Sequence, residues 1–146
     1  MENNDEKKFL YNVENLNSDN IEQYANDKNY PNECFIQNGI KSWKWEYQAQ
    51  VLKKRGFPKI QDVLDKMFVW LQDMNWPGAY TVVDTLSNIP RDIMIKHFKN
   101  AAEKAFKDND IGWLYWLREF MEKNDIKIQE LNDNELYKIL ISSIDM

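Results

Sequence analysis

The stretch Trp70-Leu71-Gln72-Asp73-Met74-Asn75-Trp76-Pro77-Gly78-Ala79 decides the fold of this chain. Proline cannot continue a helix and disfavours the helical conformation in the residue before it, so the Trp76-Pro77 pair predicts a break. Apolar residues at helical spacing lie on both sides of this stretch. We therefore predict that residues 70–79, called the corner below, form a tight turn between two packed helices.

The polar and aromatic residues of the corner support two interpretations. In the first, Asp73 or Asn75 accepts hydrogen bonds from the free N–H groups at the start of the helix that Pro77 opens. In the second, Asp73, Asn75 and Trp76 form a binding site, because indole rings would desolvate the Asp73 carboxyl group and raise its pKa. We favour the helix cap.

The composition is that of a soluble globular protein. The 146 residues are 43% hydrophobic and 29% charged, with a mean hydropathy of -0.72, so the chain can bury a core. The single cysteine, Cys34, excludes an intramolecular disulfide and any metal site built from several cysteines. We predict a disordered tail over residues 1–8 and one all-α domain over residues 9–146.

Charge and hydropathy narrow the expected partners and location. The net charge is -5, and the chain lacks the clustered cations that binding to nucleic-acid phosphates requires, so a basic protein is the favoured partner. No stretch approaches the roughly 20 apolar residues of a membrane span, and the N-terminus lacks the apolar region of a signal peptide. We expect a cytoplasmic protein with neither a nucleic-acid nor a membrane partner.

Glycine and proline divide the chain into helical segments, and no segment alternates as a strand does. Short helices are predicted within residues 9–16 and 18–25, and a loop over residues 26–41. The longer predicted helices cover residues 42–55, 60–71, 79–88, 90–106, 113–124 and 132–140. Their predicted N-terminal caps, by residue type and position, are Ser18, Ser42, one of Asp108, Asn109 and Asp110, and Asn132 with Glu135.

An internal shift of 34 residues superimposes the apolar pattern of residues 60–86 on that of residues 94–120. In the second helix of each half, the matched pairs are Ala79 with Trp113, Val82 with Trp116, Val83 with Leu117, and Leu86 with Phe120. Such a period is typical of stacked helical hairpins, although antiparallel helices of similar length could match by accident. We predict an all-α fold of antiparallel helical hairpins stacked in a HEAT-like α-α superhelical layer.

The sequence contains no motif of a familiar enzyme. A glycine-rich phosphate loop, a paired-histidine zinc motif and a nucleophile elbow are all absent. The only histidine, His97, lies on a charged helix and is expected at its surface or boundary, and Cys34 would need it as a base. We therefore predict no catalytic residue, no metal ligand and no cofactor, and an enzyme is the less favoured reading.

A second aromatic group, Trp113 with Tyr115 and Trp116, also supports two interpretations. The three rings could form a stacking platform, or Trp113 and Trp116 could belong to a buried stripe at helical spacing. We favour the buried stripe. Tyr115 and Arg118 then point away from the core, and we include both among the candidate binding residues.

The corner, with Gly56-Phe57-Pro58 upstream and Trp113-Leu114-Tyr115-Trp116-Leu117 downstream, resembles the bacterial domain of unknown function 5071 family. The resemblance covers about residues 43–123. It implies an all-α fold similar to HEAT-type helical hairpins in a cytosolic bacterial protein. It implies no established activity, substrate or catalytic residue, so no functional residue is carried over from the family.

Two functions of different classes follow. A protein–protein interaction module is the leading one, because stacked hairpins offer an extended concave surface. Small size and acidic charge favour, within this class, an immunity or antitoxin-like role against a basic protein. The alternative is a small-molecule binder or enzyme with its site at the corner, on Asp73, Asn75 and Trp76.

Overall fold

The computed structural model describes residues 13–38 and 40–142, and all the regular elements in these ranges are helices. The α-helices are α2 (Ile21–Asn26), α3 (Lys44–Arg55), α4 (Leu64–Val69), α5 (Ala79–Leu86), α6 (Arg91–Lys107), α7 (Ile111–Lys123), α8 (Ile128–Leu131) and α9 (Asn134–Ser142). Three short 3-10 helices, η1 (Asn32–Phe35), η2 (Gln61–Val63) and η3 (Trp70–Gln72), complete the set. The predicted all-α class is confirmed, whereas the predicted tail over residues 1–8 lies outside the described residues.

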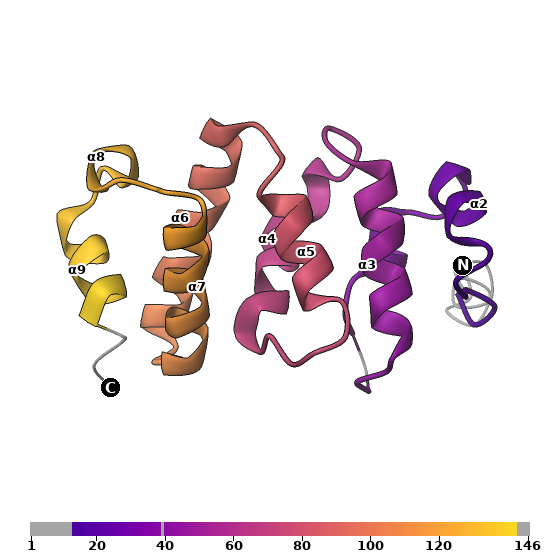
Figure 1. Cartoon of the computed structure of the whole chain (residues 1–146), viewed down its shortest axis with the longest axis horizontal. Helices are drawn as coiled ribbons and strands as arrows, with labels where there is room; N and C mark the ends of the chain where they lie inside the picture. Colours follow the sequence, from indigo (N-terminus) through magenta and orange to yellow (C-terminus); the bar gives the residue numbers. More distant parts are fainter. Residues whose placement is uncertain (1–12, 39, 143–146) are drawn as a thin grey trace, which may run out of the picture.

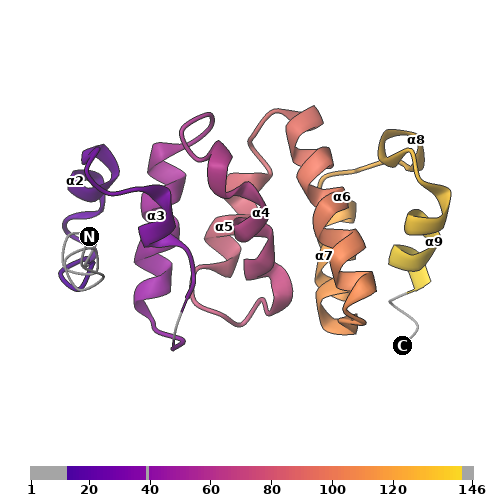
Figure 2. The ribbon, with the colours of Figure 1, turned by 180° about the vertical axis from the view of Figure 1, so that it is seen from behind.

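The helices form an elongated row that runs from α2 at one end to α9 at the other (Figure 1). Two hairpins occupy the middle of the row: α4 with η3 turns into α5, and α6 turns into α7. Helices α3, α5 and α7 lie on the side that faces the viewer in Figure 1, and we call this side the front face. Helices α4 and α6 pack against each other on the opposite side, the back face (Figure 2).

Aromatic side chains join the two hairpins in the core. The rings of Phe68, Phe98 and Phe120, from α4, α6 and α7, contact one another with centroids 5.2 to 6.3 Å apart. Trp113 is 1% exposed, and its indole N–H donates a hydrogen bond to the carbonyl oxygen of Phe68 at 3.1 Å. A buried indole that finds a polar partner combines a large apolar contact with a satisfied donor. These contacts fix the second hairpin against the first.

Arg55 fastens the N-terminal segment to the end of α3. Its guanidinium group donates to the carbonyl oxygens of Tyr24, Ala25 and Asp27 and to the side-chain oxygen of Asn32, at 2.9 to 3.2 Å. The same group lies over the ring of Phe35, 4.8 Å from its centroid. Burial lowers the pKa of the Arg55 guanidinium group, but an arginine remains charged at neutral pH.

The predicted loop over residues 26–41 is wrong in one part. Residues Asn32–Phe35 form the helical turn η1, and Phe35 is fully buried. Local sequence did not indicate a helix there because the turn is stabilised by distant contacts, above all those of Arg55 with Asn32. Val13 packs against the core and α2 packs on α3, so the N-terminal segment is part of the packed fold from residue 13 onward.

Several predicted helix starts also differ from the structure. Asp110 accepts a hydrogen bond from the Trp113 N–H, so a cap at this position is confirmed. Ser42 accepts the Lys44 N–H, but the N-cap of α3 is Trp43 and no side chain caps this helix, so the predicted Ser42 cap is wrong. Ser18 does not cap α2, which has Asn20 at its N-cap and no side-chain cap.

The predicted cap of the last helix, Asn132 with Glu135, is wrong. Asn132 ends α8 in the left-handed conformation, and the carboxylate of Asp133 accepts the Leu136 N–H instead. The short helix α8 ends at Leu131, and α9 begins at Asn134, two positions after the predicted start. The predicted helix over residues 60–71 is also divided, because 3-10 turns tighten both ends of α4.

An ion pair holds the C-terminal helices against α6. The guanidinium group of Arg91, at the start of α6, bonds both carboxylate oxygens of Glu130 and the carbonyl oxygen of Asp125. The Arg91 side chain and the Lys127 backbone N–H lower the pKa of Glu130 to about 2. Glu130 therefore stays charged, and the pair stays formed, throughout the neutral range. None of the helices in the described ranges is both long and apolar enough to cross a membrane.

Candidate functional site

The corner places Asp73 in a turn instead of at a helix terminus. One oxygen of its carboxylate accepts the backbone N–H of Asn75 at 2.8 Å. Two consecutive turns, closed by bonds from the Trp76 N–H to Asp73 and from the Ala79 N–H to Trp76, then separate Asp73 from α5. The predicted cap of α5 is therefore wrong, because Asp73 stabilises the turn itself and no side chain caps this helix.

The aromatic residues of the corner act as a joint to α3. Trp70 is fully buried, and its indole N–H donates to the carbonyl oxygen of Pro77 at 2.9 Å. The ring of Trp45, on α3, contacts the rings of both Trp70 and Trp76 edge to face. Trp76 is therefore half-buried against α3, while Asn75 is exposed beside it. The three candidate residues of the corner, Asp73, Asn75 and Trp76, thus lie together, but they belong to a packed joint.

Gly78 brings α5 and α3 close together at the corner. Its φ angle is +89°, in the left-handed region that favours glycine. A Cβ atom at this position would lie 2.7 Å from the carbonyl oxygen of Trp45 and 3.0 Å from the Cβ of Ala49. The small residues Gly78 and Ala49 therefore let the first hairpin pack directly on α3.

Helices α5 and α7 are not packed in this way, and an apolar groove lies between them. The cavity measures about 350 Å³ and is called the α5/α7 groove below. Its lining residues are Met74, Tyr80, Val83, Asp84, Trp116, Glu119, Phe120 and Lys123. Met74 comes from the corner, so the corner contributes a groove wall although its polar residues do not line the groove. Tyr80, on the α5 side of the groove, is 72% exposed.

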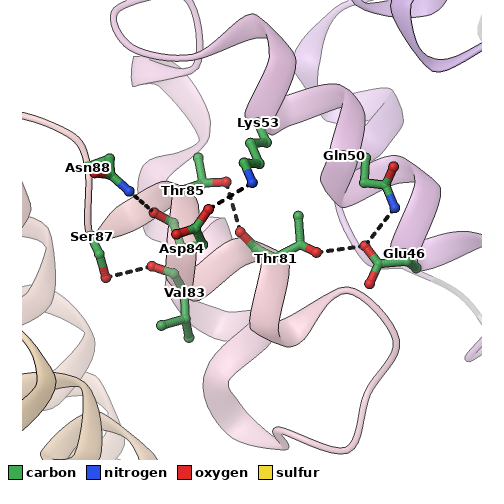
Figure 3. A network of polar contacts seen from close by, with 9 residues as sticks. All are labelled: Glu46, Gln50, Lys53, Thr81, Val83, Asp84, Thr85, Ser87 and Asn88. Carbon is green, nitrogen blue, oxygen red and sulfur yellow. Dashed lines mark hydrogen bonds and ion pairs between the residues drawn. The ribbon is translucent and has the colours of Figure 1, made fainter.

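Polar contacts connect α5 to α3, on the side of α5 that faces away from α7 (Figure 3). The Thr81 hydroxyl donates to the Glu46 carboxylate at 2.7 Å, and the Gln50 amide donates to the same oxygen at 3.2 Å. Lys53 and Asp84 form an ion pair at 2.8 Å. Because the Lys53 ammonium group lowers the pKa of Asp84, this carboxylate is charged at neutral pH.

A second cavity, the α2/α3 recess, lies beyond these contacts and measures about 810 Å³. Its lining residues are Ser18, Asp19, Ile21, Glu22, Glu46, Gln50, Lys53, Lys54 and Thr81. Three of these residues are carboxylates and two are lysines, and Lys53 is already paired with Asp84 of the groove. With Asp84 included, four negative and two positive charges give a net charge of -2. No ion pair joins Glu46 to a cation within the described residues.

The two other candidate residues lie on α7 but do not join the corner. Tyr115 is 37% exposed and contacts the ring of Trp116 edge to face. Arg118 is more buried than expected: its side chain is 11% exposed and pairs with Glu122 at 2.8 Å. Arg118 lines a separate cavity towards α9, with Tyr137 and Ile141. The five predicted residues thus occupy the corner joint and one stretch of α7.

Sequence reasoning missed most of the groove. Trp116 was assigned to a buried stripe, but it is only half-buried and forms part of a groove wall. Tyr80 offered a usable signal, because it is a large aromatic residue placed off the apolar stripe of its own helix. The charged residues Glu119 and Lys123 offered none, since exposed charges on a helix are ordinary.

Two groups with catalytic potential are placed where they have structural roles. Nδ1 of His97, on α6, lies 2.6 Å from the Asp65 carboxylate on α4, so this pair links the hairpins on the back face. Cys34 is half-buried beside Arg55, far from this pair along the chain. No group of three or more histidine, cysteine, aspartate or glutamate residues in the described ranges could hold a metal ion.

The Cys34 thiol should react slowly with alkylating reagents. Burial raises its pKa from an ordinary value of 9.0 to about 11, although Arg55 opposes the shift. Two pKa units reduce the thiolate fraction at neutral pH about 100-fold, and only the thiolate reacts. We expect iodoacetamide to modify the folded protein about 100-fold more slowly than the chain in concentrated urea, as followed by mass spectrometry. Equal rates in the two states would show that Cys34 is neither buried nor perturbed.

The fold and surface define a class: a helical protein of paired, side-by-side helices, with a groove on one face and no recognisable catalytic centre in its described part. Within this class, the chain belongs to the family described as Domain of unknown function (DUF5071), whose model matches residues 41–143. The match confirms the resemblance that the corner and its flanks indicated, and it extends past residue 123 to include α8 and α9. Comparisons with curated proteins and with solved structures returned no match.

Proposed function

We propose that this protein is a protein–protein interaction module and that its front face, centred on the α5/α7 groove, binds the partner. The α5/α7 groove is the observation that carries this proposal. It combines an apolar floor with exposed and half-buried aromatic rings, including Tyr80 and Trp116. Tyrosine and tryptophan are enriched at the energetic centres of protein interfaces, where a pocket lets them lose water on binding.

A HEAT-like stack of hairpins is part of this proposal. The shift of 34 residues that relates α5 to α7 also relates α3 to α5, and two positions are buried in all three helices. The matched sets are Trp45 with Ala79 and Trp113, and Leu52 with Leu86 and Phe120. Stacked repeats of this kind share one continuous core and present one layer of helices to their partners.

The charge of the front face supports a basic partner. The α2/α3 recess and Asp84 together carry a net charge of -2, and the whole chain carries -5. Opposite charges accelerate association and exclude partners of the wrong sign. Neutralisation of a basic protein in the cytoplasm, as by an immunity protein or antitoxin, is the specific role that we propose within this class.

The corner alone has weaker support as a site. Asp73 is occupied by the Asn75 N–H, and Trp76 packs on Trp45. Neither residue lines the groove or the recess. A small molecule bound there would have to displace packed groups, so the groove is the better candidate.

Replacing Tyr80 with alanine should weaken partner binding without unfolding the protein. The tagged chain would first capture its partner from the host in which it occurs, and the purified pair would then be titrated by calorimetry. We expect Tyr80→Ala to raise Kd at least about tenfold, as truncation of a central aromatic residue does.

Phe106→Ala is the matched control for this experiment. Phe106 is an aromatic residue on α6, 55% exposed, and it lies outside both the groove and the recess. We expect its truncation to leave Kd unchanged. Absence of any stoichiometric partner, or equal losses in the two variants, would overturn the proposed function.

A further inference from the structure

The α5/α7 groove has the form of a seat for a helix. Its α5 wall consists of Tyr80, Val83 and Asp84, spaced by three and four residues. Its α7 wall consists of Trp116, Glu119, Phe120 and Lys123, which are spaced in the same way. Side chains at this spacing lie above one another along a helix, so the groove runs parallel to both walls. The α7 wall, from Trp116 to Lys123, spans about 10 Å along its helix, or two helical turns.

The chemistry of the walls excludes one alternative, a strand that pairs with a sheet edge. An extended peptide gains affinity chiefly by pairing its backbone with the open edge of a sheet. Both walls here are helices, whose backbone groups are already bonded internally. An inserted segment must therefore satisfy its own backbone groups, and a helix does so.

The surroundings of the groove determine the charge of that helix. On the side of α5 that faces α3, Thr81 donates to Glu46, and both residues line the α2/α3 recess. The recess and Asp84 together carry a net charge of -2. On α7, Glu119 and Lys123 have the spacing of a favourable ion pair, yet no such pair is formed within the described residues. The Glu119 carboxylate is thus left available for a cation from outside.

We propose that the segment inserted into the α5/α7 groove is a basic amphipathic helix of the partner, with its apolar stripe in the groove and its lysine or arginine flank towards α3. This inference rests on the proposed function and adds the chemical class of the bound element. The apolar stripe contacts Met74, Val83 and Phe120, while the basic flank meets Glu46 on the α3 side. On the opposite wall, Glu119 of α7 accepts a further lysine or arginine of the same helix.

Three synthetic peptides of about 18 residues test this inference. The first has leucine at helical spacing with lysine on the opposite face, the second replaces every lysine with glutamate, and the third is a scrambled form of the first. Each would be titrated into the isotope-labelled full chain while backbone amide resonances are recorded. We expect only the first peptide to bind, at least about tenfold more tightly than the others, and to shift amides of α5 and α7.

Two charge variants sharpen the test. Glu46→Gln should weaken binding of the lysine peptide several-fold, since it removes a carboxylate from the path of the basic flank. Glu103→Gln removes an exposed carboxylate from α6 on the back face and should change nothing. Equal binding by the lysine and glutamate peptides, equal binding by the scrambled peptide, or no binding at all overturns the inference.

These failures differ from failure of the proposed function. If the captured partner binds through Tyr80 but the lysine peptide does not bind, the protein is an interaction module that takes another kind of segment. If no partner depends on Tyr80, the front face itself is the wrong surface.

Discussion

Replacing Gly78 with alanine should lower the free energy of unfolding by about 3 kcal/mol or more. The left-handed backbone at this position costs a residue with a Cβ about 1–2 kcal/mol. The Cβ would also lie 2.7 Å from a backbone oxygen of Trp45, so α5 must move away from α3 at a further cost typical of overpacking. Urea unfolding followed by circular dichroism measures the loss, and the melting temperature should fall by about 6–12 °C.

Gly112→Ala is the control for this prediction. Gly112 lies exposed in the first turn of α7, and a Cβ there meets nothing closer than 3.8 Å. Alanine is a better helix former than glycine, so we expect a gain of about 0.5–1 kcal/mol. If Gly78→Ala behaved like Gly112→Ala, the corner would not be the close contact between α3 and the first hairpin.

Replacing Arg55 with methionine should detach the N-terminal segment and cost about 2–4 kcal/mol. The change keeps an unbranched side chain over Phe35 but removes the guanidinium donors to the carbonyl oxygens of Tyr24, Ala25 and Asp27, of which Tyr24 and Asp27 each keep one backbone N–H donor. Partly buried acceptors that lose a charged donor are expensive to leave unpaired. Hydrogen–deuterium exchange should show faster exchange in α2 and η1 and unchanged protection in α6 and α7.

Lys54→Met tests whether this effect is specific. Lys54 is the exposed neighbour of Arg55 on the same helix turn, and no hydrogen bond or ion pair involves its side chain within the described residues. We expect its replacement to change stability by less than about 0.5 kcal/mol and to leave exchange in α2 unchanged. Unchanged exchange of α2 and η1 in Arg55→Met would mean that other contacts hold the segment in place.

Local sequence predicted the helices and the corner because their causes are local. Pro77 marks the turn and apolar spacing marks the buried face of α6, and both effects act within a few residues. The role of Gly78 was not predictable in this way, because it depends on Trp45 and Ala49 from another helix. The same holds for η1, since Arg55 reaches Asn32 across 23 residues.

The candidate site was harder to predict than the fold. Asp73 was chosen because tryptophans surround it in sequence, but these rings point to α3 and leave the carboxylate in a turn. The groove depends instead on the separation between α5 and α7, which the packing of α4 on α6 sets from the back face. No property of either helix alone encodes that separation, so Trp116 could be placed on a face but not in a groove.

The central proposal, that the front face binds the partner, can be tested most directly by photo-cross-linking in the living host. A benzophenone amino acid would replace Tyr80 on the front face in one variant and Phe106 on α6 in another. Both Tyr80 and Phe106 are exposed aromatic residues, so neither substitution perturbs the hydrophobic core. We predict one stoichiometric protein adduct from position 80 and none from position 106. An adduct from position 106 alone, or from neither position, would contradict the proposal.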